Sequence, residues 1–133
     1  MIGLDTNVLI RVLIADDPKQ AASAERLLRE AIEAGEPCFI SDPVLCETEW
    51  VLGSYYRVPR AEIAAALESL LARESLFAFE SVDAFRKALD AYRRGKAEFS
   101  DFLIGAKAET QGARTTFTFD RVLARQQGFS LLQ

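Results

Sequence analysis

Three aspartates stand where a predicted strand ends and a helix begins, which is where open parallel sheets bind their ligands. Asp5 ends a short apolar run at the N-terminus, Asp120 ends the alternating run Thr115–Phe119, and Asp101 lies in the first turn of a predicted helix. Each aspartate also has a structural interpretation, because a carboxylate at a helix N-terminus accepts hydrogen bonds from free N–H groups. If the three side chains meet, their oxygens can bind a hard divalent cation.

The surroundings of Asp101 favour a role beyond helix capping. Ile104, Gly105 and Ala108 lie three, four and seven residues after Asp101, so the pattern places Asp101 on the inward stripe of its helix. A carboxylate on that stripe must be paired or must coordinate an ion. Gly105, one turn further along, is expected to leave room beside the carboxylate.

Polar neighbours can support the other two aspartates. Asn7 lies two residues after Asp5 and is close enough to orient its carboxylate. Thr118 and Asp120 share one face of a strand, so the hydroxyl can support the carboxylate or a bound water.

A glutamate on the helix that opens at Pro43 can join the aspartates, and two candidates compete for this place. At about 100° per residue, Glu47 and Glu49 flank the inward arc of the helix on opposite sides. That arc holds Val44, Thr48, Val51, Leu52 and Tyr55. Helical periodicity alone does not choose between the two glutamates.

The chain contains no histidine. This absence excludes general-base catalysis by imidazole, Ser-His-Asp triads, Cys-His dyads and histidine-based zinc sites. Hydrolysis must then rest on carboxylates with Mg²⁺ or Mn²⁺, which prefer oxygen ligands. Such a cation polarises a phosphate and lowers the pKa of a bound water that attacks phosphorus, and a second ion can complete the clamp.

Length and composition are those of one domain with its own core. The chain has 133 residues, of which 50% are apolar, and a chain of this size needs neither disulfides nor a structural metal for stability. The net charge of −4 argues against a pure nucleic-acid-binding module. It argues less against a metal-dependent nuclease, because bound cations offset acidic ligands.

The cysteines and the apolar stretches predict a cytoplasmic protein. Cys38 and Cys46 have no CxxC spacing and no secretory leader before them, so we expect buried free thiols. The longest apolar stretch, Val8–Ile14, is interrupted by Arg11 and is far shorter than the ~20 residues of a membrane span.

Strand and helix signals alternate along the chain. The predicted strands are Ile2–Leu4, Pro37–Ser41, Leu76–Phe79, Thr115–Phe119 and Phe129–Leu132. The first four predicted helices start at Thr6, at Pro18 after the cap Asp17, at Pro43 after Ser41 or Asp42, and at Arg60. Two more follow the caps Ser81 and Ser100, and a short last helix runs from Asp120 to about Gln127. This alternation predicts a single-domain three-layer α/β/α sandwich with a mainly parallel central sheet over residues 1–133.

Four segments together resemble the PIN-domain nucleases, and within them the VapC-type ribonuclease toxins of toxin–antitoxin pairs. They read GLDTNVLI from Gly3, SDPVLCE from Ser41 leading to WVL at Trp50, FSDFLIG from Phe99 and TFTFD from Thr116. The segments occur in the order typical of the family and span nearly the whole chain. Each is weak alone, and together they are fairly specific.

The resemblance implies both a catalytic set and a function. It implies that the catalytic and metal-binding acids are Asp5, Glu47, Asp101 and Asp120, and that Thr6, Asn7 and Thr118 support them. Glu47 is thereby preferred to Glu49. The implied function is a Mg²⁺- or Mn²⁺-dependent endoribonuclease, the toxin of a type II pair, that cleaves structured RNA such as tRNA or rRNA by attack of metal-bound water. Membership further implies a homodimer and a VapB-type antitoxin that covers the active site.

Basic and aromatic residues around these segments have two interpretations. The side chains that can hold an RNA backbone are Arg11, Arg93, Arg94, Lys96, Arg121 and Arg125, although a solvated helix end is favoured for most of them. The aromatics that can stack on bases or line an antitoxin groove are Trp50, Tyr55, Tyr56 and Phe102, and core packing is favoured for these.

Three other functions fit parts of the same pattern. A PIN nuclease of RNA processing would lack the small upstream antitoxin gene that is expected beside a toxin. An aspartyl-phosphate phosphatase also begins with a strand that ends in an acid, but Asn7 stands where a second aspartate is usual and no later lysine motif follows. A non-catalytic interaction module, whose acids only cap helices, is distinguished by an RNA cleavage assay.

Overall fold

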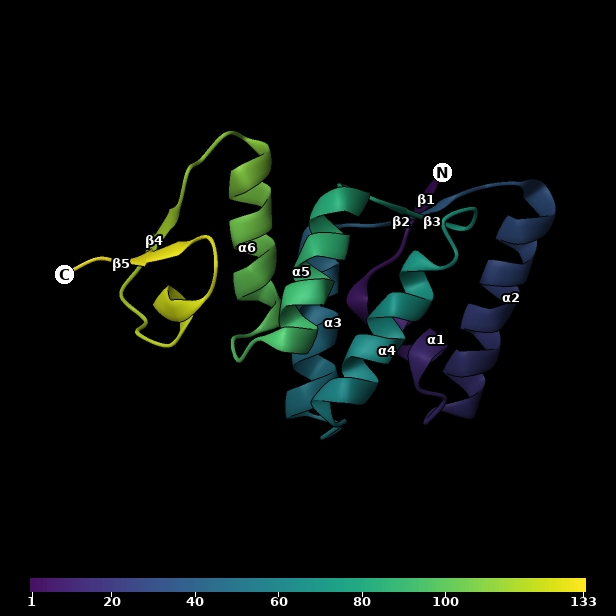
Figure 1. The fold of residues 1–133 in the computed structure, drawn as a ribbon. Helices are drawn as coiled ribbons and strands as arrows, with labels where there is room; N and C mark the ends of the chain where they lie inside the picture. The colour runs from purple at the N-terminus through teal and green to yellow at the C-terminus, as the bar shows by residue number, and fades with distance from the viewer. The chain divides into compact units, whose positions relative to one another are not determined.

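The computed structural model describes residues 1–133, which form two compact units, Met1–Glu80 and Ser81–Gln133. Figure 1 shows the elements of each unit, coloured from purple at the N-terminus to yellow at the C-terminus. The first unit contains β1 (Ile2–Gly3), α1 (Thr6–Leu13), α2 (Pro18–Ala34), β2 (Cys38–Ile40), α3 (Asp42–Ser54), α4 (Arg60–Leu71) and β3 (Phe77–Phe79). The second contains α5 (Val82–Arg94), α6 (Phe99–Thr110), β4 (Thr116–Thr118), the 3₁₀ turn η1 (Leu123–Arg125) and β5 (Phe129–Leu131).

All strand pairs in the structure are parallel. In the first unit the order is β1-β2-β3, with Ile2 opposite Cys38 and Cys38 opposite Phe77. In the second unit β4 pairs with β5, with Thr116 opposite Phe129. Parallel neighbours need a crossover connection, which the helices supply. The predicted α/β class with parallel strands is confirmed, whereas a single domain over residues 1–133 stays a prediction.

Several helix boundaries follow from local signals, as predicted. The side chains of Asp17, Ser41 and Ser81 accept hydrogen bonds from backbone N–H groups at the starts of α2, α3 and α5. Gly35 ends α2 with a φ of 63°, a conformation that glycine adopts without steric cost.

Two predictions about the second unit are wrong. Helix α6 is capped by Glu98 rather than by Ser100, because the Glu98 and Asp101 side chains each accept a bond from the other residue's backbone N–H in a capping box. The short helix expected from Asp120 to Gln127 is reduced to the single 3₁₀ turn η1.

Each unit has its own apolar core. The first unit buries Leu9, Ile40, Leu45, Leu52 and Leu67, from α1, β2, α3 and α4, and each such side chain contributes about 1.5–3 kcal/mol. In the second unit the Phe99 ring packs edge-on against Phe85 at 5.8 Å and against Tyr92 at 6.0 Å between ring centroids. These rings fasten α6 to α5 and so fix the helix that carries Asp101.

The expected packing of two aromatics on α3 is wrong. Trp50 is 61% exposed and Tyr55 is 74% exposed. The inward face of α3 is instead formed by Leu45, Thr48, Glu49 and Leu52, a stripe rotated from the predicted arc. Phe102 is buried as expected, and Tyr56 is half-buried.

Both cysteines carry free thiols, as predicted, but only Cys38 is buried, and Cys46 is half-buried. None of the helices combines the length and the apolar character that crossing a bilayer would require.

Candidate active site

Asp5 lies at the carboxyl end of β1 and opens α1. Its side-chain Oδ1 accepts a hydrogen bond of 3.0 Å from the backbone N–H of Val8, so Asp5 is the N-cap of the helix. The capping interpretation of this acid is therefore correct, and the carboxylate is also exposed. One oxygen is used by the helix, and the other has no hydrogen-bond partner within the protein.

Thr6 connects α1 to α3. Its hydroxyl donates a hydrogen bond of 2.6 Å to Oε1 of Glu47, while the residue itself is only 9% exposed. A bond to an ionised acceptor is shorter and stronger than one between neutral groups. Because Thr6 directly follows Asp5, this bond holds the Glu47 carboxylate at the N-terminus of α1. Thr6 therefore contacts one of the predicted acids, Glu47, through its hydroxyl.

The environments of Glu47 and Glu49 differ sharply. Glu47 is exposed, whereas Glu49 is 4% exposed and lies on the inward face of α3. Next to Glu49, the buried Thr48 hydroxyl has no hydrogen-bond partner. Glu47 is therefore the one of the two carboxylates that a ligand from solvent can reach.

Asn7 and Arg11 lie with Asp5 along a pocket of about 620 Å³ between α1 and α2. The Asn7 side chain is exposed and makes no hydrogen bond, so it does not orient Asp5. The Arg11 guanidinium bonds to Asp16 at 3.0 Å, to Gln20 at 2.7 Å and to the Tyr56 hydroxyl at 3.0 Å. This network ties α1 to α2 and to the end of α3.

Asp101 lies in the first turn of α6 and is half-buried. Its Oδ2 accepts a hydrogen bond of 3.3 Å from the backbone N–H of Glu98. The inward stripe predicted for this helix is wrong, since Ile104 is 59% exposed and the buried positions of α6 are Phe99, Phe102, Leu103 and Ala106.

The expectation that Gly105 leaves room beside the Asp101 carboxylate is wrong. A Cβ at this position would lie 2.6 Å from Cζ of Phe129, so the ring of Phe129 fills the space that the glycine leaves. The glycine therefore permits β5 to approach α6, and it does not open room beside Asp101.

Asp120 follows β4 and lies three residues before the start of η1. Its Oδ1 accepts hydrogen bonds from the backbone N–H groups of Val122 at 2.9 Å and Leu123 at 3.1 Å. The Thr118 hydroxyl accepts a bond of 3.0 Å from the backbone N–H of Asp120. Thr118 thus positions Asp120 through its backbone, and the expected contact with the carboxylate is absent.

Electrostatics link the two aspartates of the second unit. Burial raises the pKa of Asp101, the hydrogen bond from Glu98 lowers it, and the negative charges of Asp120 and Glu98 raise it further. A partly desolvated carboxylate beside a like charge is a group that a cation would stabilise. Oxygen donors without histidine suit Mg²⁺ or Mn²⁺, so this pair fits such an ion chemically.

The four predicted acids are divided between the units, with Asp5 and Glu47 in Met1–Glu80 and Asp101 and Asp120 in Ser81–Gln133. Neither unit by itself gathers three or more metal-ligating side chains in one cluster. Glu98 was missed by the sequence analysis, although its position three residues before Asp101 is the spacing of a capping box.

Most of the basic candidates are exposed on the second unit. Arg93, Lys96 and Arg121 are exposed, and Arg94 pairs with Asp90 at 2.7 Å one helical turn away. Arg94 remains 70% exposed in its side chain, so this pair does not remove it from solvent.

Comparison with known proteins finds similarity over most of the chain. The model of the PIN domain family matches residues 2–128, which spans both units. A VapC ribonuclease of Aquifex aeolicus (strain VF5) is 29% identical over 118 residues, which cover 89% of this chain and 86% of that protein.

Proposed function

Because this chain belongs to the PIN domain family, we propose that it is a VapC-type ribonuclease that hydrolyses the RNA backbone with a divalent cation. The environment of Asp101 at the start of α6 carries the proposal, since this half-buried carboxylate has a pKa raised by burial and, to a smaller extent, by the negative charges of Asp120 and Glu98. The likeness to a VapC ribonuclease over most of both chains supports RNA as the substrate.

The proposed metal-binding residues are Asp5, Glu47, Asp101 and Asp120, two from each unit. When bound, Mg²⁺ or Mn²⁺ polarises the phosphate and activates the attacking water. Thr6 holds the Glu47 carboxylate through its hydroxyl. Thr118 fixes the backbone of Asp120, and Asn7 contributes an exposed amide beside Asp5 in the pocket between α1 and α2.

The basic side chains on the second unit supply contacts to the RNA backbone in this proposal. Arg93, Arg94, Lys96 and Arg121 are exposed and so can meet phosphates. Arg11 is the weakest member of this set, because Asp16 already neutralises its guanidinium at 3.0 Å.

We propose attack by water and not by the ribose 2′-hydroxyl, since the chain has no histidine to activate that hydroxyl. The expected products therefore carry 5′-phosphate and 3′-hydroxyl ends. Products that end in 2′,3′-cyclic phosphate would contradict this route.

The metal-dependent activity is tested by incubating purified tRNA and rRNA with the protein and Mg²⁺ or Mn²⁺. We expect EDTA or Asp101→Asn to reduce cleavage at least about 100-fold, because even the partners of metal ligands contribute about 10- to 100-fold. Asp83→Asn is the matched control, since Asp83 is an exposed first-turn acid of α5 and should leave cleavage unchanged. Full cleavage in EDTA, or by Asp101→Asn, would overturn the proposal.

The biological part of the proposal is a toxin that acts in the cytoplasm as a homodimer and is neutralised by a VapB-type antitoxin. Expression of the chain alone should arrest growth, and co-expression of the product of an adjacent small gene should restore it. Light scattering on the purified protein measures the oligomeric state. Growth unaffected by an active enzyme would favour a PIN nuclease of RNA processing.

A further inference from the structure

The second unit contains a pocket that the proposed chemistry does not use. Its volume is about 780 Å³, and it lies between the helices α5 and α6 on one side and residues 113–116 and 125–129 on the other. Neither Asp101 nor Asp120 lines it. The volume is within the range of small-ligand sites, which is about 300–1,000 Å³.

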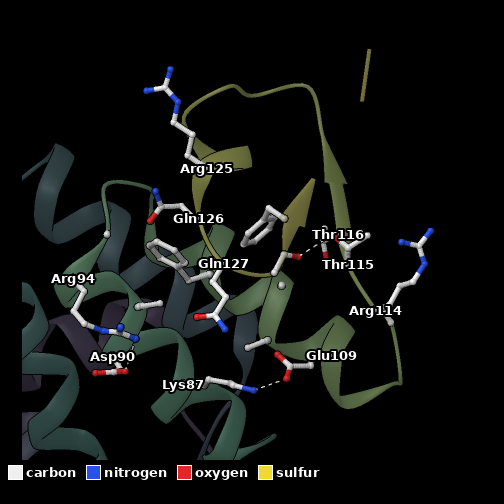
Figure 2. Close-up of a pocket in the computed structure, with 18 residues that line it drawn as sticks. Lys87, Asp90, Arg94, Glu109, Arg114, Thr115, Thr116, Arg125, Gln126 and Gln127 are labelled. Atoms are coloured by element: carbon white, nitrogen blue, oxygen red, sulfur yellow. Dashed lines mark hydrogen bonds and ion pairs between the residues drawn. The ribbon is translucent and has the colours of Figure 1, made fainter. Parts of the chain in front are cut away.

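The charges around the pocket do not cancel. Lys87 pairs with Glu109 at 2.6 Å and Arg94 pairs with Asp90 at 2.7 Å, which uses both acids of the lining. Arg114 and Arg125 have no partner in the structure, so two positive charges remain. Figure 2 shows their guanidinium groups at opposite sides of the pocket, both extending outward. The mouth of the pocket therefore favours a ligand with negative charges at two separated points.

The interior of the pocket offers one partly exposed aromatic ring. Phe102 and Phe129 both line the pocket, but Phe102 is buried, whereas Phe129 is half-buried. The ring of Phe129 is held against Gly105, where any Cβ would lie 2.6 Å from it. Aromatic side chains in a concave site are platforms on which nucleobases stack.

Two amide side chains belong to the lining of the same pocket. Gln126 and Gln127 line the pocket and make no side-chain hydrogen bonds within the protein. Figure 2 shows the Gln127 amide directed toward the ion pair of Lys87 with Glu109. An amide has both donors and acceptors, which is the combination that reads the edge of an unpaired base.

We infer that this pocket binds one unpaired nucleotide of the RNA substrate. The base enters between the Phe129 ring and the glutamine amides, and the phosphates on either side meet Arg114 and Arg125. The inference rests on the proposed function for the identity of the ligand, and it adds a site for single-stranded RNA apart from the catalytic acids.

The test measures RNA binding without cleavage. A short fluorescein-labelled single-stranded RNA of mixed sequence is titrated with the full chain carrying Asp101→Asn, in EDTA, and anisotropy gives the Kd. Arg114→Gln combined with Arg125→Gln should weaken binding about 100-fold, which is about tenfold for each lost charge-assisted contact. The slope of log K against log[salt] should fall by about 0.7 for each arginine removed. Arg29→Gln, an exposed arginine of α2 outside the pocket, is the matched control and should change neither quantity.

Two further arms examine the nature of the ligand. The same strand annealed to its complement should bind with an affinity that the double variant does not alter, because a paired base cannot enter the pocket. Poly-glutamate should fail to displace the single strand. A double variant that binds like the Arg29→Gln control, an equal loss of affinity for the duplex, or displacement by poly-glutamate would each overturn the inference.

The outcomes separate this inference from the proposed nuclease. If the wild type does not cleave RNA but the two arginines still govern single-strand binding, the pocket assignment holds and the catalytic proposal fails. If the wild type cleaves RNA and the two arginines have no effect on single-strand binding, the catalytic proposal holds and the pocket assignment fails.

Discussion

In the first unit Glu47 receives a hydrogen bond from the Thr6 hydroxyl, whereas in the second unit burial, together with the negative charges of Asp120 and Glu98, raises the pKa of Asp101. A neutral donor stabilises the ionised glutamate without any ion. The Asp101 carboxylate, in contrast, is a group that a cation would stabilise. The two carboxylates therefore differ in what stabilises their ionised forms, which is a hydrogen bond within the protein for Glu47 and, in the proposed function, a bound cation for Asp101.

The largest expected effect distinguishes the two glutamates of α3. Glu47→Gln should reduce RNA cleavage at least about 100-fold, as expected for loss of a metal ligand, because the exposed carboxylate is the one within reach of an ion. Glu49→Gln, in the core, should leave the cleavage rate of the folded protein within about threefold. A rate assay normalised to folded protein, measured by circular dichroism, checks both variants. The reversed pattern would reassign the site to Glu49.

A smaller effect is expected from removing the Thr6 hydroxyl, which positions the Glu47 carboxylate. Thr6→Val removes the donor while keeping the shape, and cleavage should fall about tenfold, the lower end of the range for residues that orient metal ligands. Thr6→Ser restores the hydroxyl and should recover most of the rate. If Ser and Val behave alike, the hydrogen bond is not what positions the glutamate.

A comparison of two helical glycines tests packing in each unit. A Cβ on Gly105 of α6 would lie 2.6 Å from Phe129, so Gly105→Ala should lower the free energy of unfolding by about 1–3 kcal/mol. A Cβ on Gly53 of α3 would lie 3.5 Å from Ile63, an ordinary contact. Gly53→Ala should therefore raise the free energy of unfolding by up to about 1 kcal/mol, since alanine favours helix. Urea denaturation measures the free energy of unfolding of both variants. Equal changes in the two would show that the close approach of Phe129 does not determine the effect at Gly105.

The smallest expected effect concerns protonation of Asp101 in the metal-free protein. Burial and the charges of Asp120 and Glu98 raise its pKa, so the native state binds this proton more readily than the unfolded chain does. Stability contributed by this group is then present at low pH and is lost as the pH rises through the native pKa. Asp120→Asn removes one like charge and should lower the pKa of Asp101, which a carboxyl NMR titration in EDTA measures. An unchanged pKa would mean that the two aspartates do not interact.

Local signals made much of the fold predictable. Asp17 with Pro18, Ser41 and Ser81 each marked a helix start, since a cap depends on residues only a few positions apart. The prediction of Ser100 as a cap was wrong although the signal is also local. Glu98 and Asp101 form a capping box in which each side chain accepts a bond from the other residue's backbone N–H.

Features that depend on distant residues were not predictable. The space beside Gly105 is filled by Phe129, which lies 24 residues away along the chain (129 − 105). Glu47 and Glu49 flank the arc predicted for the helix from Pro43, and only the packing of the other elements decides that Glu49 faces inward. The strands are two or three residues long, so their sequence carries little information about how they divide into sheets.

Each of the three aspartates has one oxygen committed to the backbone: Oδ1 of Asp5, Oδ2 of Asp101 and Oδ1 of Asp120. In the proposed site every aspartate would therefore keep one oxygen that accepts no hydrogen bond and is the readiest to contact an ion. Monodentate contacts suit Mg²⁺, which is small and keeps several waters in an octahedral shell. Ca²⁺ readily takes two oxygens from one carboxylate, so these backbone hydrogen bonds would favour Mg²⁺ over Ca²⁺ in the proposed site.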